Sequence, residues 1–387
     1  MKRVGHLWEK FCSIETAEAA IRWGTQNKRS DRVVVRIFGY EKHGSDHPAG
    51  SLDPVKVHDY AVRLVKELKE NRWYHKPGKH RHIRSSGKNR EIEIAKLKDH
   101  IVQWMAMLTI EDLETRKMYR HSCGNLPKRG IEDARKTVER WVRSGDCKFF
   151  VKLDIRHFFK SVRQDVVIGM LEELICDEWF IYLIRRIFWQ FPKGLPLGFY
   201  PSQWLANFVL WKLDRRIVET GVDHIRYVDD LVLVSNNKRT LHRVVGVIRQ
   251  ELGRIRLRLK DNYQVCRFLF RKKSGELIGR AIDFMGFVFR RNRTVLRKKI
   301  MIRATRFAGR LKRSARIATG QALSMMSRIG WFKHTSTSIV WDRYIAPCVN
   351  VEVLKGIIRK STKEAAHENR VDKRAGLRTP SGTVCTA

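Results

Sequence analysis

Acidic side chains are scarce in this chain, and three of them stand where short apolar segments end. The sequence has 40 Asp and Glu against 79 Lys and Arg, a net charge of +39. Asp154 closes the β-rich run 149–155, and Asp229 and Asp230 separate the two halves of the β-rich run 224–234. Carboxylates that converge in a basic protein repel one another unless a dication lies between them, and their hard oxygens select Mg²⁺ or Mn²⁺. The pattern predicts a two-metal site of the kind that serves in-line phosphoryl transfer.

Asp229 is the acid that we expect to face Asp154. Neighbouring residues on a strand point to opposite faces of the sheet, so only one of Asp229 and Asp230 can share a face with Asp154. We choose Asp229. The alternative is that the two acids form the turn of a surface hairpin, although no Gly or Asn is present to make that turn easy.

The elements that must position these acids follow from periodicity. A basic hairpin is predicted around 85–89 and further strands in 263–289, whereas Gly and Pro mark loops at 40–54 and 193–201. Asp53 is the expected cap of the helix that begins at Pro54. Apolar spacings of three and four predict helices in 1–30, 55–73, 95–118, 163–190, 202–214, 240–257, 300–311 and 322–332.

The composition excludes several classes of protein and favours one that binds nucleic acid. A net charge of +39 requires a polyanionic partner, and nucleic acid fits a charge that is spread along the whole chain. The 18 Phe and 11 Trp supply a core, which excludes wholesale disorder. No apolar run reaches the length of a membrane span and no signal peptide opens the chain, so we expect a cytoplasmic protein. Seven cysteines without CxxC spacing argue against a zinc ribbon or a disulfide framework.

Three segments together resemble the sequence boxes of reverse transcriptases. Residues 226–230, Arg-Tyr-Val-Asp-Asp, resemble the YxDD box, and residues 150–159 resemble the box that carries the first metal ligand. Residues 194–203 lie between them and are similar to the box that contacts the incoming nucleotide and the template. The boxes stand in the family's order, and the resemblance covers roughly residues 80–345. It implies an α+β right-hand polymerase fold.

The expected domains follow the same resemblance. The fingers hold the basic hairpin, the palm is an antiparallel sheet, and the thumb is helical and basic. The boundaries are 1–78 for an N-terminal helical extension and the start of the fingers, 79–148 for the fingers, 149–289 for the palm with finger helices 163–192 inserted, 290–360 for the thumb, and 361–387 for a flexible basic tail.

The form of the middle box indicates a subfamily. Residues 196–203 read LGxxxSQ where retroviral and group II intron enzymes carry a PQGxxxSP-like box, and this form resembles the reverse transcriptases of diversity-generating retroelements. That resemblance implies a bacterial or phage enzyme that copies a template-repeat RNA with errors at adenines. It also implies a small basic accessory variability determinant, expected to be oligomeric, as partner. The alternatives are a defence-associated or group II intron-like reverse transcriptase, a non-catalytic RNA-binding scaffold, and an unrelated basic RNA-binding protein.

The resemblance also assigns the metal ligands and a proton donor. Asp154 and Asp229 would hold two Mg²⁺ ions, with Mn²⁺ able to substitute, and the carbonyl of Ile155 would be a further ligand. Asp230, the second acid of the box, would support this set. Lys260 resembles the lysine that protonates the pyrophosphate leaving group, and a solvated lysine is the alternative.

The nucleotide site would combine a fingertip hairpin, an aromatic gate and the middle box. Phe159 resembles the steric gate that excludes a 2′-hydroxyl, and core packing beside Phe158 is the alternative. The hairpin's basic side chains suit triphosphate oxygens or, alternatively, any phosphate backbone. For Ser202 a helix cap is equally plausible. The nucleotide-binding candidates, which bind dNTPs in this resemblance, are Arg84, Lys88, Arg90, Phe159, Leu197, Gly198, Ser202, Gln203 and Tyr227.

Two further features concern the nucleic acid. Leu197 stands where many relatives have Gln, which removes a hydrogen-bonding side chain from the nucleotide pocket and predicts low fidelity. The segment from Arg290 onward holds 23 Lys and Arg against five Asp and Glu, so it is expected to grip template RNA and the primer or cDNA strand through phosphates. The candidates are Arg297, Lys298, Lys299, Arg303, Lys333 and His334.

Overall fold

The computed structural model describes residues 3–26, 28, 31–39, 52–85, 88–145, 147–191 and 193–361, without the side chains of Arg84, Ser85, Lys88 and Glu114. The chain divides into two compact units, Met1–Arg280 and Ala281–Ala387, and each is described by itself. The loop predicted at 40–54 lies outside the described residues up to 51, as does the tail from 362. No helix in the described part of the chain is both long and apolar enough to cross a membrane.

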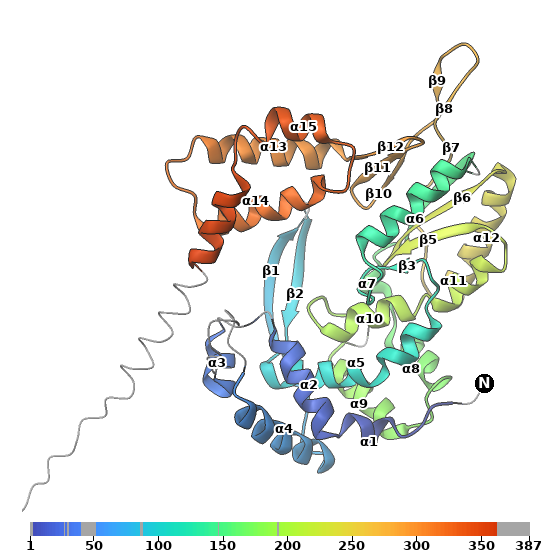
Figure 1. Cartoon of the computed structure of the whole chain (residues 1–387). Helices are drawn as coiled ribbons and strands as arrows, with labels where there is room; N and C mark the ends of the chain where they lie inside the picture. The colour runs from blue at the N-terminus through green and yellow to red at the C-terminus, as the bar shows by residue number, and fades with distance from the viewer. Residues whose placement is uncertain are drawn as a thin grey trace, which may run out of the picture. The chain divides into compact units, whose positions relative to one another are not determined.

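A helical layer opens the first unit (Figure 1). The carboxylate of Asp53 accepts hydrogen bonds from the backbone N–H groups of Val55 and Lys56, and Pro54 occupies the first helical position, which confirms the predicted cap. The layer packs α2 against both α4 and α5. It consists of α1 (Leu7–Phe11), α2 (Ile14–Thr25), α3 (Arg32–Phe38), α4 (Pro54–Lys69) and α5 (Leu97–Lys117).

A five-stranded sheet of order β3-β5-β6-β4-β7 forms the centre of this unit. All neighbouring strands are antiparallel except β3 and β5. The strands are β3 (Ser122–Cys123), β4 (Phe149–Asp154), β5 (Asp223–Tyr227), β6 (Asp230–Ser235) and β7 (Val265–Arg267). Helices pack against the sheet and bury its central strands, which accounts for their near-continuous apolar runs. These helices are α6 (Ile131–Ser144), α11 (Trp211–Val218) and α12 (Lys238–Arg254).

The predicted basic hairpin is present as β1 (Lys79–Ser85) and β2 (Lys88–Ile94), paired in the register Ser85↔Lys88. Short helices join β4 to β5, namely α7 (Phe158–Ser161), α8 (Gln164–Glu172), α9 (Glu178–Phe188) and α10 (Tyr200–Phe208), followed by α11. The helical pattern predicted over 163–190 is present as two helices, because Asp177 caps a new helix by accepting the N–H of Phe180. The predicted helix 202–214 is likewise two helices, separated at Leu210 by a non-helical backbone conformation. The unit ends with the pair β8 (Phe270–Arg271) and β9 (Leu277–Ile278).

The second unit combines a small antiparallel sheet with helices. Its strands are β10 (Ile282–Phe284), β11 (Phe287–Arg290) and β12 (Arg293–Leu296), and its helices are α13 (Lys298–Lys312), α14 (Thr319–Phe332), α15 (Ser338–Tyr344) and a last helix at 351–361. The core of the unit buries Phe284, Phe289 and Leu296 completely. Because the units divide after Arg280, β10 and β11 belong with the helices rather than with the five-stranded sheet.

Candidate active site

The three acids meet at one end of the central strands. In the antiparallel pair of β4 and β6, Asp154 lies directly opposite Asp230, so these two residues share a face of the sheet. Tyr227 pairs with Asp230, which leaves Val228 and Asp229 as the two residues of the turn between β5 and β6. Asp229 is therefore in a turn, where strand alternation does not apply, and our choice of Asp229 as the facing acid by that rule was wrong. By register, the acid that faces Asp154 is Asp230.

Electrostatics also connects the three acids. Burial, the charge of Asp230 and the charge of Asp154 together raise the pKa of Asp229 to about 6. Two lysines partly neutralise the others. The ammonium group of Lys260 pairs with the carboxylate of Asp154, and that of Lys152 lies 3.8 Å from the carboxylate of Asp230. The site thus concentrates negative charge that cations already balance in part.

The carboxylate oxygens of this site fit a hard dication, although two of the three carboxylates pair with lysines in this structure. Within the described ranges no three His, Cys, Asp or Glu side chains are grouped closely enough to bind a metal. Two backbone hydrogen bonds flank Ile155. The N–H of Lys260 donates to the carbonyl of Asp154, 2.9 Å, and the N–H of Arg156 donates to the carbonyl of Arg258, 2.8 Å. The carbonyl of Ile155 consequently points away from that segment and toward the side of β6.

The turn that carries Asp229 is strained. Val228 has φ = +58°, a left-handed conformation that a β-branched residue rarely adopts. Such a residue costs on the order of 1–3 kcal/mol and persists only where its surroundings enforce it. The sequence has no Gly or Asn at this turn, and as a consequence a valine adopts the left-handed conformation.

A buried ion pair holds Val228 in this left-handed conformation. Arg226 and Asp214 are both fully buried, and the guanidinium Nε donates to the two carboxylate oxygens at 2.9 and 3.0 Å. Arg226 also donates to the carbonyl oxygen of Val228, 2.9 Å, and to the side-chain oxygen of Asn207, 2.9 Å. Burial raises the pKa of Asp214, but the charges and hydrogen bonds of Arg226 and His224 together outweigh burial and hold this pKa well below its usual range. Hydrogen bonds from a fully buried network of side chains therefore fix the strained turn.

Our sequence reasoning missed this network. Ser122 donates to Asp214 at 2.5 Å, and the side-chain amide of Asn207 donates to the carbonyl of Gly124, 2.7 Å, next to the turn. The available signal was an arginine at position 226 inside an apolar strand, because a buried charge requires a partner. The partner itself, Asp214, lies on a helix, and no local pattern identifies it.

The middle box packs against the basic hairpin rather than leaving its backbone open. The N–H of Glu93 on β2 donates to the carbonyl of Leu197, 2.8 Å, and a Cβ at Gly198 would collide with the carbonyl of Glu93. Gly198, with φ = +108°, thus allows the backbone of β2 to approach closely. Ser202 is fully buried within α10 with no partner for its hydroxyl among the described residues, so the helix-cap alternative was wrong.

The remaining nucleotide candidates differ in exposure. Phe158 is buried and Phe159 half-buried, with ring centroids 5.6 Å apart; they begin the short helix α7 rather than ending a strand. Leu197 and Tyr227 are half-buried, whereas Gln203 and Arg90 are exposed. The side chains of Arg84 and Lys88 lie outside the described part of the structure.

Comparison with known proteins decides the family. The family model described as reverse transcriptase (RNA-dependent DNA polymerase) matches residues 74–287, more than half of the 387 residues, including all three acids. The chain belongs to the reverse transcriptase family. The α+β right-hand fold class expected for it agrees with the mixed helices and antiparallel sheets observed.

Curated relatives come from introns and from a retron. The retron Ec73 reverse transcriptase of Escherichia coli is 25% identical over 140 residues, which cover 31% of this chain and 43% of the relative. An uncharacterized 91 kDa protein in the cob intron of Schizosaccharomyces pombe is 26% identical over 178 residues, 43% of this chain and 22% of the relative. This reverse transcriptase chain spans less than half the length of the curated relatives it matches.

Solved structures of telomerase are similar at low identity. Telomerase from Candida albicans, in complex with a fragment of telomeric RNA, has a TM-score of 0.44 at 13% identity, covering 80% of this chain and 64% of that chain. Apo telomerase from Candida tropicalis has a TM-score of 0.46 at 11% identity, covering 88% and 67%.

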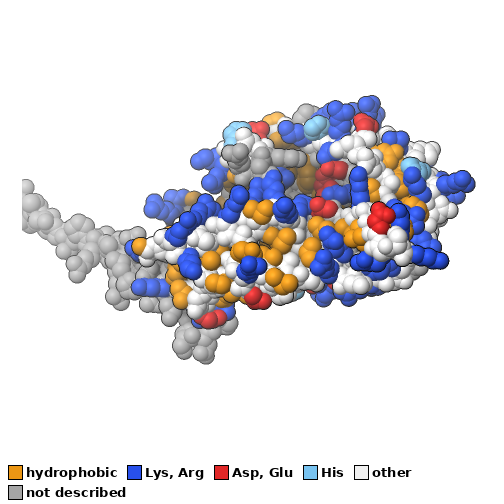
Figure 2. All heavy atoms as spheres, turned by 90° about the horizontal axis from the view of Figure 1, so that it is seen from above, with side chains coloured by type: hydrophobic (Ala, Val, Ile, Leu, Met, Phe, Trp, Pro, Cys, Tyr) orange, Lys and Arg blue, Asp and Glu red, His pale blue; other side chains and the backbone are white. Residues whose placement is uncertain are grey.

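In the second unit of this reverse transcriptase, most of the predicted nucleic-acid contacts are exposed. Lys298, Lys299, Arg303, Lys333 and His334 are solvent-exposed. Arg297 instead holds Asp283 through its Nε, at 2.8 and 3.0 Å from the two carboxylate oxygens. Figure 2 shows Lys and Arg side chains spread over one face of the molecule with few Asp and Glu, as the net charge requires.

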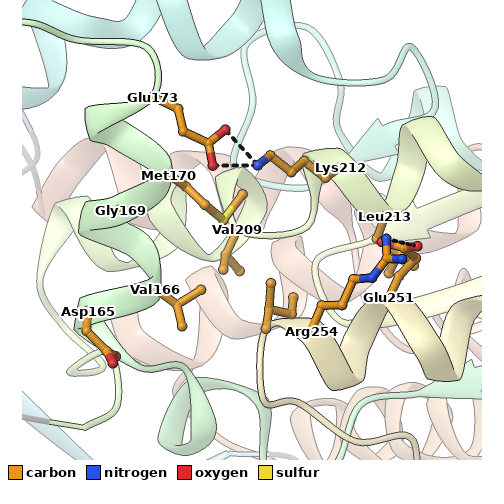
Figure 3. Close-up of a pocket in the computed structure, with 11 residues that line it drawn as sticks. Asp165, Val166, Gly169, Met170, Glu173, Val209, Lys212, Leu213, Glu251 and Arg254 are labelled. Carbon is orange, nitrogen blue, oxygen red and sulfur yellow. Dashed lines mark hydrogen bonds and ion pairs between the residues drawn. The ribbon is translucent and has the colours of Figure 1, made fainter.

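A hollow of about 440 Å³ lies away from the acids, between α8, α11 and α12 (Figure 3). Met170, Val209 and Leu213 are among its apolar lining residues. Lys212 pairs with Glu173 at 2.6 Å and Arg254 with Glu251 at 2.8 Å within the lining, and Asp165, the remaining charged residue, pairs with Arg163 at 2.8 Å. The hollow therefore presents no uncompensated charge for chemistry.

Proposed function

We propose that this chain is an RNA-directed DNA polymerase that extends a primer with dNTPs on an RNA template. The observation that carries the proposal is the register of Asp154 opposite Asp230 with Asp229 in the adjoining turn, within a chain of the reverse transcriptase family. The primer 3′-oxygen attacks the α-phosphorus of the dNTP, the bond to the β-phosphate oxygen breaks, and pyrophosphate leaves.

Each residue of the site has a role in this reaction. Asp154, Asp229 and Asp230, with the carbonyl of Ile155, hold two Mg²⁺ ions or Mn²⁺ in their place. When bound, these ions favour deprotonation of the attacking hydroxyl and stabilise charge on the leaving group. Lys260, which pairs with Asp154 in this structure, is then free to donate a proton from Nζ to the pyrophosphate.

The nucleotide and the nucleic acid use the surrounding elements. Phe159, which is half-buried, restricts the space at the sugar C2′, so deoxynucleotides are selected. The β1–β2 hairpin, through Arg84, Lys88 and Arg90, contacts the triphosphate, and Leu197, Gly198, Ser202, Gln203 and Tyr227 shape the pocket. The exposed basic side chains of α13, and Lys333 and His334 just after α14, contact template RNA and cDNA phosphates.

The finer proposal is a role in a diversity-generating retroelement. The LGxxxSQ form of residues 196–203 and the apolar side chain of Leu197 support it. The enzyme would then copy a template-repeat RNA with errors at adenines, assisted by a small basic, oligomeric accessory protein. A group II intron-like or retron-like role is the second candidate, and the intron and retron relatives favour it.

Primer extension tests both levels. With a defined RNA template, a DNA primer, dNTPs and Mg²⁺, the purified chain should extend the primer, and omitting the metal should abolish extension. Failure to extend any primer on RNA under these conditions would overturn the polymerase proposal. Sequencing the cDNA then separates the subfamilies, because only the diversity-generating assignment predicts errors concentrated opposite adenine.

A further inference from the structure

A cleft of about 560 Å³ lies where the C-terminal end of α12 meets the segment that follows it. Its lining is dominated by guanidinium groups, with a single acid, Asp261. The lining residues are Arg156, Arg249, Gly253, Arg256, Leu257, Arg258, Leu259 and Asp261. Four arginines against one aspartate leave an excess of three positive charges in a space too small for a nucleic-acid duplex.

The positive charge of this cleft is offset only in part, by Asp261 in its lining and by Asp165, on which the charge of Arg256 acts. All four arginines are solvent-exposed, and across the described residues none of them forms an ion pair; Arg249 instead stacks over the ring of Tyr263 at 5.1 Å. Neighbouring arginines behave differently, because Arg254 pairs with Glu251 at 2.8 Å and Arg163 with Asp165 at 2.8 Å. The cleft is therefore a local concentration of positive charge that the fold compensates only in part.

The backbone register also brings two of these positive charges close together. The antiparallel bridge between Ile155 and Leu259, with its two flanking hydrogen bonds, places Arg156 directly opposite Arg258. Like charges directly opposite each other on paired strands destabilise the pair. An anion bound between the two guanidinium groups would convert this repulsion into two charge-assisted hydrogen-bonding contacts.

The same register connects the cleft to the catalytic acids. Asp154 and Lys260 form the next cross-strand pair, and because alternate residues share a face, this ion pair and the Arg156–Arg258 pair lie on one face. Two residues of strand separate them by roughly 7 Å. An anion held between Arg156 and Arg258 would thus lie at a distance from Asp154 that a polyphosphate can span.

We propose that this arginine cleft is a phosphate-binding site that takes the polyphosphate of an incoming nucleotide or the pyrophosphate that leaves. Guanidinium forks match phosphate oxygens, and four of them suit a multiply charged, compact anion better than a single phosphodiester. The inference rests on the proposed polymerase function for its ligand. Its place in the reaction is either delivery of the nucleotide to the acids or removal of the product from them.

Binding without catalysis tests the site. Calorimetric titration of the full chain with inorganic pyrophosphate and with dGTP, in EDTA, avoids the metal site. The Arg156→Gln/Arg258→Gln double variant should bind its preferred anion about tenfold more weakly or worse, since charge-assisted hydrogen bonds are lost. Arg243→Gln, an exposed arginine of the same helix outside the cleft, should bind as the parent does. A thermal melt confirms that each variant is folded.

The results separate the possible occupants. If only pyrophosphate binding weakens, the cleft serves product release, and if dGTP binding weakens as well, it serves nucleotide entry. Parental affinity for both anions in the double variant would overturn the proposal, as would an equal loss in Arg243→Gln. A loss of RNA affinity alone would also overturn it, in favour of a backbone contact. Because the assay needs no polymerisation, a chain that binds pyrophosphate in the cleft yet extends no primer refutes only the polymerase proposal.

Discussion

Arg226 donates a hydrogen bond of 2.9 Å to the carbonyl oxygen of Val228, the residue whose left-handed backbone forms the turn that presents Asp229. The same guanidinium is neutralised by Asp214 in a fully buried pair. One buried side chain thus links the position of a catalytic acid to the interior of the sheet, and the arrangement of the site depends on residues that touch no substrate.

Replacing this arginine should affect both stability and rate. Arg226→Gln leaves the carboxylate of Asp214 buried without its partner, so we expect a loss of about 3–5 kcal/mol in the free energy of unfolding. Arg226→Lys keeps the charge but cannot donate to both Asp214 and Val228, so it should fold better than the Gln variant and still extend primers slowly. Urea unfolding and single-turnover extension measure these effects, with Arg243→Lys as the exposed control. A fully active Arg226→Lys enzyme would show that the turn does not need this contact.

The strain at Val228 predicts an unusual order of stabilities. Glycine adopts a positive φ without penalty, whereas alanine at this position keeps the strain and both lose the valine side chain. We expect Val228→Gly to be more stable than Val228→Ala by about 1 kcal/mol. Urea denaturation of the two variants compares them directly. An alanine variant at least as stable as the glycine variant would mean that residue 228 is not left-handed in solution.

Burial of His100 predicts a loss of stability in mild acid. Burial first, and the charge of Lys28 second, lower the pKa of His100 to about 4, against an ordinary value of 6.5. Between these values the unfolded chain binds a proton that the folded chain does not, so the free energy of unfolding should fall as the pH drops from about 6.5 to about 4. His100→Asn should reduce this slope, and His242→Asn, at an exposed position on α12, should leave it unchanged. An unaltered slope in His100→Asn would place the titrating group elsewhere.

Leu197 predicts the fidelity of copying. Its backbone carbonyl is fixed by Glu93, and its half-buried side chain offers the nucleotide only packing. Packing alone discriminates by about 1–3 kcal/mol, roughly 10–200-fold. The parent enzyme should therefore be error-prone, with errors opposite adenine, and Leu197→Gln should raise fidelity. Deep sequencing of cDNA made by both enzymes on one RNA template measures this, and equal accuracy at all four bases in the parent would remove the support for the diversity-generating assignment.

Local signals in the sequence predicted local structure well. Asp53 and Pro54 identified a helix start, and the β-rich runs at 149–155 and 224–234 identified the two strands that carry the acids. The sequence did not show which residues far apart in the chain lie side by side in the fold. The register that sets Asp154 opposite Asp230 pairs β4 with β6, two strands about 75 positions apart in the chain, and the contact of Gly198 with Glu93 joins residues about a hundred positions apart. For the same reason, the sequence did not identify Asp214 as the partner of Arg226.

Single-turnover primer extension on RNA by the parent and by Asp229→Asn tests whether the three acids perform nucleotidyl transfer. The substitution preserves size and removes the charge, and the buried network behind the turn remains. The account predicts a loss of at least about 10³-fold in rate, in line with the contribution of an essential charge to a metal-assisted step, with RNA affinity unchanged. An Asp229→Asn enzyme that extends the primer at the parental rate would contradict it.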